Sequence, residues 1–89
     1  MKVWVISRYR HHNEDVEILR VCSSVEKLIQ FVKPYYDFRF YNENDRQKRM
    51  ETYGFKTWDE YVWWSMTDGV LELDNKYDDI LKWESFELD

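Results

Sequence analysis

Few side chains in the sequence have the type and spacing that a reaction needs. His11 and His12 are adjacent, so on an extended segment they point to opposite sides and are poor ligands for one metal ion. Cys22 is the single cysteine and closes an apolar run, which favours a small core residue in a reducing compartment over a nucleophile. No serine or cysteine stands beside an evident base. The sequence therefore predicts a protein that is not an enzyme, with no catalytic residue, no metal and no cofactor.

Carboxylates gather in the last third of the chain. The segment DGVLELDNKYDD contains five of them, namely Asp68, Glu72, Asp74, Asp78 and Asp79. Carboxylate oxygens bind Ca²⁺ and Mg²⁺, but the spacing of a calcium-binding loop is absent here. Residues 57–89 carry two Lys or Arg against ten Asp or Glu, whereas residues 1–56 carry eleven against eight, within a net charge of −5. We expect a negative surface that faces solvent or a basic partner.

Basic and aromatic residues alternate in the middle of the chain. The cations of this stretch are Arg39, Arg46, Lys48 and Arg49. Such mixtures bind single-stranded nucleic acid through phosphate contacts and base stacking. Carboxylates dilute the charge, however, and pairs such as Asp45 and Arg49 fit the exposed face of an ordinary charged helix. Single-stranded nucleic-acid binding by the segment 38–56 is therefore the alternative hypothesis.

The segment TWDEYVWWSMTDG, residues 57–69, contains three of the five tryptophans. On a helical wheel, Trp58 shares one face with Tyr61, Val62 and Met66, which predicts that this face is buried. Trp63 and Trp64 flank the polar face on opposite edges, so one covering surface does not bury both. Either the segment 35–55 covers them, or one of them stays partly exposed as an anchor for a partner.

The elements that position these residues follow from periodicity and from helix-end signals. Strands are predicted at 2–7, 16–22, 70–73 and 80–88, with the first two joined as an antiparallel hairpin. Ser23 and Glu26 fit a capping box that begins a helix, and Pro34 is expected to end it. A short polar helix over 45–54 stops at Gly54, and Thr57 with Glu60 begins the tryptophan-rich helix. Residues 35–44 are compatible with a short strand or a structured loop.

This order of elements predicts an α+β fold in one domain, residues 1–89. The fold is a small antiparallel sheet, made of the N-terminal hairpin plus the C-terminal strand, with two or three helices on one face. Aromatic residues make up 19% of the chain, and they bury large areas per residue. A core of sufficient size is therefore expected without disulfide bonds.

Three motifs lie near the chain ends: MKVWVIS at the start, VCSSVEKLIQFV after the hairpin and WESFELD at the end. They resemble a group of short uncharacterised bacteriophage proteins that begin Met-Lys-Val-aromatic-Val and end Glu-Leu-Asp. The resemblance covers about residues 1–34 and 80–89. It implies a phage origin and a β-β-α-β core, with residues 35–79 as an insertion. It implies no activity and no site residues.

The expected function is binding without catalysis. The protein would be a phage-encoded accessory or counter-defence inhibitor that occupies a host protein stoichiometrically, the target being a basic nucleic-acid-binding or defence protein. The expected contact residues are Trp63, Trp64, Asp68, Glu72, Asp74, Asp78 and Asp79. A homodimer through the exposed aromatic residues is a further possibility. No apolar run is long enough for a membrane span or a signal peptide, so we expect the cytoplasm of the host cell and no membrane.

Overall fold

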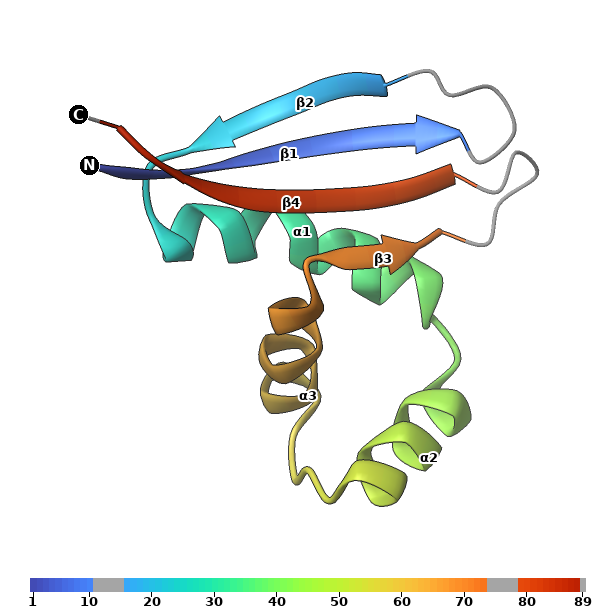
Figure 1. The fold of residues 1–89 in the computed structure, drawn as a ribbon. Helices are drawn as coiled ribbons and strands as arrows, with labels where there is room; N and C mark the ends of the chain where they lie inside the picture. Colours follow the sequence, from blue (N-terminus) through green and yellow to red (C-terminus); the bar gives the residue numbers. More distant parts are fainter. Residues whose placement is uncertain (11–15, 74–78, 89) are drawn as a thin grey trace.

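Four antiparallel strands form one sheet in the order β2-β1-β4-β3 (Figure 1). The strands are β1 (Lys2–Arg10), β2 (Val16–Cys22), β3 (Val70–Glu72) and β4 (Asp79–Glu87). The structure is a computed structural model that describes residues 1–10, 16–73 and 79–88. β1 and β4 lie at the centre and pair along their whole length, from Lys2 opposite Glu87 to Arg10 opposite Asp79. The pairing therefore places the two ends of the described chain side by side.

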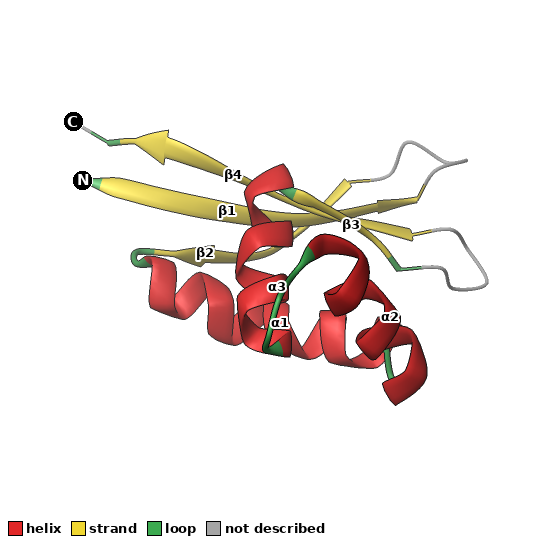
Figure 2. Ribbon diagram, turned by 90° about the horizontal axis from the view of Figure 1, so that it is seen from below, coloured by secondary structure: helices red, strands yellow, loops and turns green. Residues whose placement is uncertain are grey.

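Three helices lie on one side of this sheet and face the viewer in Figure 2, and α2 lies farthest from the sheet, next to α3 (Figure 1). They are α1 (Val25–Arg39), α2 (Glu43–Tyr53) and α3 (Trp58–Ser65), and a 3₁₀ turn, η1 (Met66–Asp68), continues α3. The predicted α+β fold, with an antiparallel sheet and helices on one face, is confirmed. No described helix is both long and apolar enough to cross a membrane.

The core forms where alternate strand residues meet α1 and α3. Ile6 of β1 and Leu81 of β4 have no exposed surface, and Val32 and Tyr36 of α1 are equally buried against them. β4 alternates between the two faces, because Leu81 and Trp83 are buried on the helix side while Phe86 on the other face is 47% exposed. Cys22 is buried, as expected of a core residue.

Pro34 does not end α1, contrary to the prediction. The helix continues to Arg39, so residues 35–39 are helical and not a strand or a loop. Pro34 is exposed and removes one backbone hydrogen bond, which costs about 3 kcal/mol. The extra turn buries the rings of Tyr36 and Phe40, each of which contributes roughly 1.5–3 kcal/mol. Tertiary burial therefore offsets the local penalty.

Most other predicted helix ends are confirmed. Gly54 ends α2 in the left-handed conformation at φ 80°, and the Thr57 side chain accepts a hydrogen bond from the Glu60 amide at 3.2 Å. At the start of α1 the cap is one residue later than predicted, because Ser24 and not Ser23 accepts from the Lys27 amide. β1 also runs three residues past the predicted end, since its pairing with β4 continues to Arg10.

The two glycines provide a matched test of the contact between η1 and β4. Both have positive φ, but a Cβ at Gly69 would lie 3.0 Å from the Trp83 carbonyl oxygen, whereas one at Gly54 would meet nothing within 4 Å. We expect Gly54→Ala to lower the free energy of unfolding by about 1–2 kcal/mol, through backbone strain alone. Gly69→Ala is expected to lower it by roughly 1–2 kcal/mol more, because the Trp83 carbonyl must move. Urea unfolding followed by tryptophan fluorescence measures both, and equal losses would contradict this view of the contact.

Candidate functional site

Trp63 and Trp64 are both partly exposed, at 53% and 45%, and they lie on different surfaces. Trp63 lines a pocket between α3 and the sheet. The Trp64 ring lies 5.1 Å from the Tyr53 ring and 5.4 Å from the Phe55 ring, between ring centres. The helical wheel therefore separated the two tryptophans correctly. The segment 35–55 covers Trp64 in part, while Trp63 is left open beside the pocket.

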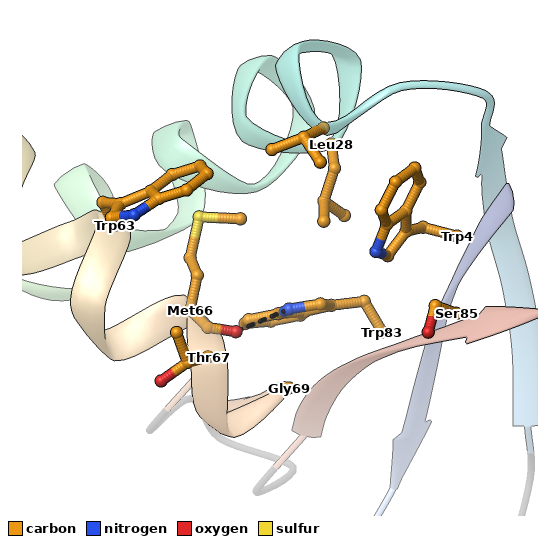
Figure 3. A pocket seen from close by; sticks show the side chains of 9 residues that line it. Trp4, Leu28, Trp63, Met66, Thr67, Gly69, Trp83 and Ser85 are labelled. Carbon is orange, nitrogen blue, oxygen red and sulfur yellow. Dashed lines mark hydrogen bonds between the residues drawn. The ribbon is translucent and has the colours of Figure 1, made fainter. Parts of the chain in front are cut away.

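The pocket beside Trp63 has a volume of about 270 Å³ (Figure 3). The indole of Trp83 forms its floor, the side chain of Trp4 stands on the far side from Trp63, and Leu28 lies between these two at the top of the view. Met66 lies between Trp63 and Trp83 in the same view. Tryptophans from β1, α3 and β4 thus surround one space. An apolar space of this kind accepts a hydrophobic or aromatic group of a ligand or partner.

Two hydrogen bonds hold α3 in place beside the pocket. The Trp83 Nε1 donates to the Met66 carbonyl oxygen at 2.9 Å, and the Tyr36 hydroxyl donates to the Ser65 Oγ at 3.1 Å. Burial raises the pKa of Tyr36 to about 12, so its hydroxyl stays a neutral donor at physiological pH. The floor and one wall of the pocket are therefore fixed by buried contacts, whereas the Trp63 side chain itself is half exposed.

The exposed surface of α3 next to the pocket is acidic. The sequence from Trp58 to Gly69 contains Asp59, Glu60 and Asp68 and no Lys or Arg. Asp59 and Glu60 precede Trp63 by four and three residues, so they lie on the same side of the helix. Lys33 of α1 neutralises Asp59 in part, with 3.2 Å between Nζ and Oδ1. The indole of Trp63 therefore lies beside carboxylates that attract a basic partner.

The carboxylates predicted to bind a partner are not equivalent in the structure. Asp68 and Glu72 lie on the side of Trp64, where both line a groove that this tryptophan shares. Asp79 is only 4% exposed, and its Oδ1 lies 3.7 Å from the Nε of Arg10. Its expected place on a solvent-facing acidic surface is therefore corrected, because β4 begins at Asp79 and turns it inward. Asp74, Asp78, His11 and His12 lie outside the described residues.

The basic residues of the alternative hypothesis divide into two groups. Arg39, Lys48 and Arg49 line a groove of about 380 Å³ with the rings of Phe40 and Tyr53. The guanidinium carbons of Arg39 and Arg49 lie 4.8 Å and 4.1 Å from the centre of the Phe40 ring. This groove brings three cations beside the exposed ring of Tyr53, a combination that single-stranded nucleic acid binds, whereas the Phe40 ring is buried.

Arg46 belongs to the second group, because backbone carbonyl groups of α1 and its cap hold its guanidinium. Its Nε donates to the Phe40 carbonyl oxygen, and its Nη2 donates to the Asp37 carbonyl oxygen at 2.9 Å. The guanidinium also lies over the Trp58 ring, 5.2 Å from the ring centre. Cations favour the C-terminal end of a helix, where carbonyl groups lack helical partners. Arg46 therefore caps α1 and does not line the basic groove.

The sequence did not identify Trp4 and Trp83 as site residues. They come from β1 and β4, and they join Trp63 only because these two strands pair and α3 crosses the same face. The alternation of side chains along the two strands was a partial indication, since Trp4 and Trp83 both lie on the side of the sheet that faces the helices. That pattern predicts burial, however, and does not predict that three tryptophans border one open pocket.

The fold and the pocket define a small two-layer α+β domain with a tryptophan-lined pocket at the junction of the layers. Comparison of the chain with protein-family models, with curated proteins and with solved structures gives no match.

Met66 provides a reporter for the pocket. The chain has three methionines, and Met66 lines the pocket whereas Met50 lies in α2. We expect indole to shift the methyl resonance of Met66 in ¹³C-methyl-methionine spectra, with a dissociation constant of roughly 1 mM for so small a ligand. The Met50 resonance is the internal control, and Trp63→Ala should weaken the response. Equal shifts of both resonances would contradict a binding pocket at Trp63.

Proposed function

We propose that the protein is a non-enzymatic binding factor that occupies the surface of a partner protein. The observation that carries this proposal is the half-exposed Trp63 beside a pocket lined by Trp4 and Trp83. Tryptophan is the residue most enriched where interfaces concentrate their binding energy. A protruding apolar side chain of the partner enters the pocket, and Trp63 covers it from one side.

The charge around Trp63 indicates the class of partner. Asp59 and Glu60 are exposed on α3 beside Trp63, and α3 contains no Lys or Arg. A basic partner is steered toward such a surface, and an acidic partner is repelled. Together with the resemblance of the chain ends to short bacteriophage proteins, the proposal extends to an accessory or counter-defence inhibitor of a basic host protein. Inhibition follows from occupation of that partner's surface and requires no reaction.

Capture from a host lysate with the tagged full-length chain, followed by mass spectrometry and titration of the captured partner, tests this function. We expect Trp63→Ala to weaken binding by about 2 kcal/mol, or roughly 30-fold, because it removes the aromatic anchor. Phe38→Ala is the matched control, since Phe38 is 81% exposed on α1 and lines no pocket described above. Glu60→Lys should slow association most at low salt. Equal affinity of wild type and Trp63→Ala would refute the proposed surface.

A second candidate function rests on the basic groove of α1 and α2. We propose, as the alternative, that Arg39, Lys48 and Arg49 contact phosphates while a base stacks on Tyr53, which is 52% exposed. Asp45 lines the same groove, and the whole chain carries a charge of −5, so long-range attraction of nucleic acid is weak. The carboxylate in the groove and the negative net charge both weaken nucleic-acid binding, so this function ranks below binding of a partner protein.

Fluorescence anisotropy with a labelled oligothymidylate tests the alternative. Three cationic contacts predict that the logarithm of the binding constant falls with the logarithm of salt concentration at a slope of about −2. Lys48→Ala should weaken binding and reduce that slope, whereas Lys27→Ala should leave both unchanged, because Lys27 lies at the start of α1. Absence of binding at low salt would rule the alternative out.

A further inference from the structure

Apart from Glu72, Lys82 and Glu84, the sheet face opposite the helices carries apolar or neutral residues, and no described element covers it (Figure 1). An antiparallel sheet with one face in water normally carries polar residues on that face. Here Val16, Ile18 and Val21 of β2 are 66%, 65% and 57% exposed, and Phe86 of β4 is 47% exposed. Val5 of β1 lies on the same face, opposite Val21. An exposed apolar face of this extent indicates an interaction surface.

The outward residues of β4 have a self-complementary order. They run Ile80, Lys82, Glu84 and Phe86, so an apolar residue stands at each end and a cation and an anion stand in the middle. The Lys82 Nζ lies 2.8 Å from the Glu84 Oε1. When the same order is reversed, each apolar residue meets an apolar residue and each charge meets the opposite charge. A two-fold axis that passes midway between Lys82 and Glu84 places the β4 strands of two copies in opposite directions, and it therefore produces this reversed order.

We propose that a second copy of this chain covers the outer face, with the two sheets packed face to face about a two-fold axis perpendicular to the strands. In this arrangement Lys82 of one copy faces Glu84 of the other, and the two ion pairs combine into a group of four alternating charges. Ile80 of one copy meets Phe86 of the other. The side chains of the two outer faces fill a layer about 10 Å thick, as in sandwiches of aligned sheets.

The neighbouring strands agree with the same axis. Ser7 lies opposite Lys82 and Val5 opposite Glu84, so the axis also passes midway between Val5 and Ser7 of β1. On β2, Ile18 pairs with Ser7 and Val21 pairs with Val5. The axis therefore places Ile18 of one copy over Val21 of the other. Each of these contacts joins apolar or neutral residues, and no like charges meet across the centre.

Charge and area also favour a second copy as the occupant. Two chains of net charge −5 repel each other, so they associate best through a face near neutrality, and the centre of this face carries one cation and one anion. The strands have 9, 7, 3 and 9 residues. At the usual rise per residue and strand spacing, the face of this sheet has a flat area of roughly 450 Å². The side chains that project from it make the accessible area larger. A standard interface buries about 800 Å² per partner, so we infer a dimer of moderate, micromolar affinity.

The proposal is independent of the proposed function. The Trp63 pocket lies on the helix side of the sheet, so packing of the outer faces leaves one pocket open on each copy. The dimer then presents two equivalent pockets on opposite sides, and it binds a partner with two or more sites with higher avidity than a monomer.

Sedimentation equilibrium of the full chain tests the arrangement through its charges. We expect the wild type to dimerise with a micromolar dissociation constant. Lys82→Glu and Glu84→Lys should each weaken the dimer at least about tenfold, because each places four like charges at the axis. The double variant with both changes restores alternating charges and should return to within a few-fold of the wild type. Phe38→Lys, a change of an exposed apolar residue on the helix side, is the matched control and should leave the dimer unchanged.

Several outcomes would overturn the proposal. One is a wild type that remains monomeric at about 1 mM, and another is a dimer that neither single charge change weakens. Failure of the double variant to restore a dimer lost in both single variants also contradicts the axis. A dimer that Trp63→Ala abolishes and Glu84→Lys leaves intact would assign the interface to α3. Circular dichroism verifies the fold of each variant, and the charged side chains concerned are partly or fully exposed.

Discussion

The buried indole of Trp83 connects the two layers on which the candidate site depends. Its Nε1 donates to the Met66 carbonyl oxygen at 2.9 Å, its backbone amide donates to the Gly69 carbonyl oxygen at 2.9 Å, and its ring meets the Tyr36 ring edge-on at 6.4 Å. α3 has eight residues, and an isolated helix of that length is not stable in water. The contacts of Trp83 therefore hold α3 against β4 and α1, and they fix the floor of the pocket that Trp63 borders.

The exposed surfaces of the protein follow from a shortage of chain to cover them. A short aromatic helix directs side chains to several sides, and only Tyr61 and Val62 of α3 are buried. Trp64 is partly covered by Tyr53 and Phe55, while Trp63 is left beside a pocket. The sheet has the same shortage on a larger scale, because all described helices lie on one side of it. Both surfaces suit association, and they lie on opposite sides of the sheet.

Much of the fold was predictable because short-range signals and tertiary packing agree. The span of β2, the alternation of β4 and the caps at Thr57 and Gly54 all depend on residues within a few positions of each other. The prediction failed at Pro34, where a local signal for a helix end opposes the burial of Tyr36 and Phe40. A periodic pattern does not report the free energy that distant residues contribute, so the last turn of α1 was misassigned.

The candidate site was predictable only in part. The sequence by itself determined that Trp63 and Trp64 point to opposite sides, because the helical period alone sets that angle. It also determined that Leu81 and Trp83 share one side of β4, because side chains alternate along a strand. Only the tertiary structure decided that Trp4, Trp63 and Trp83 share one pocket, that Arg46 caps α1 and that Asp79 is buried. The physical reason is that these features depend on contacts between segments far apart in the chain, which strand pairing and helix packing create and which local periodicity does not contain.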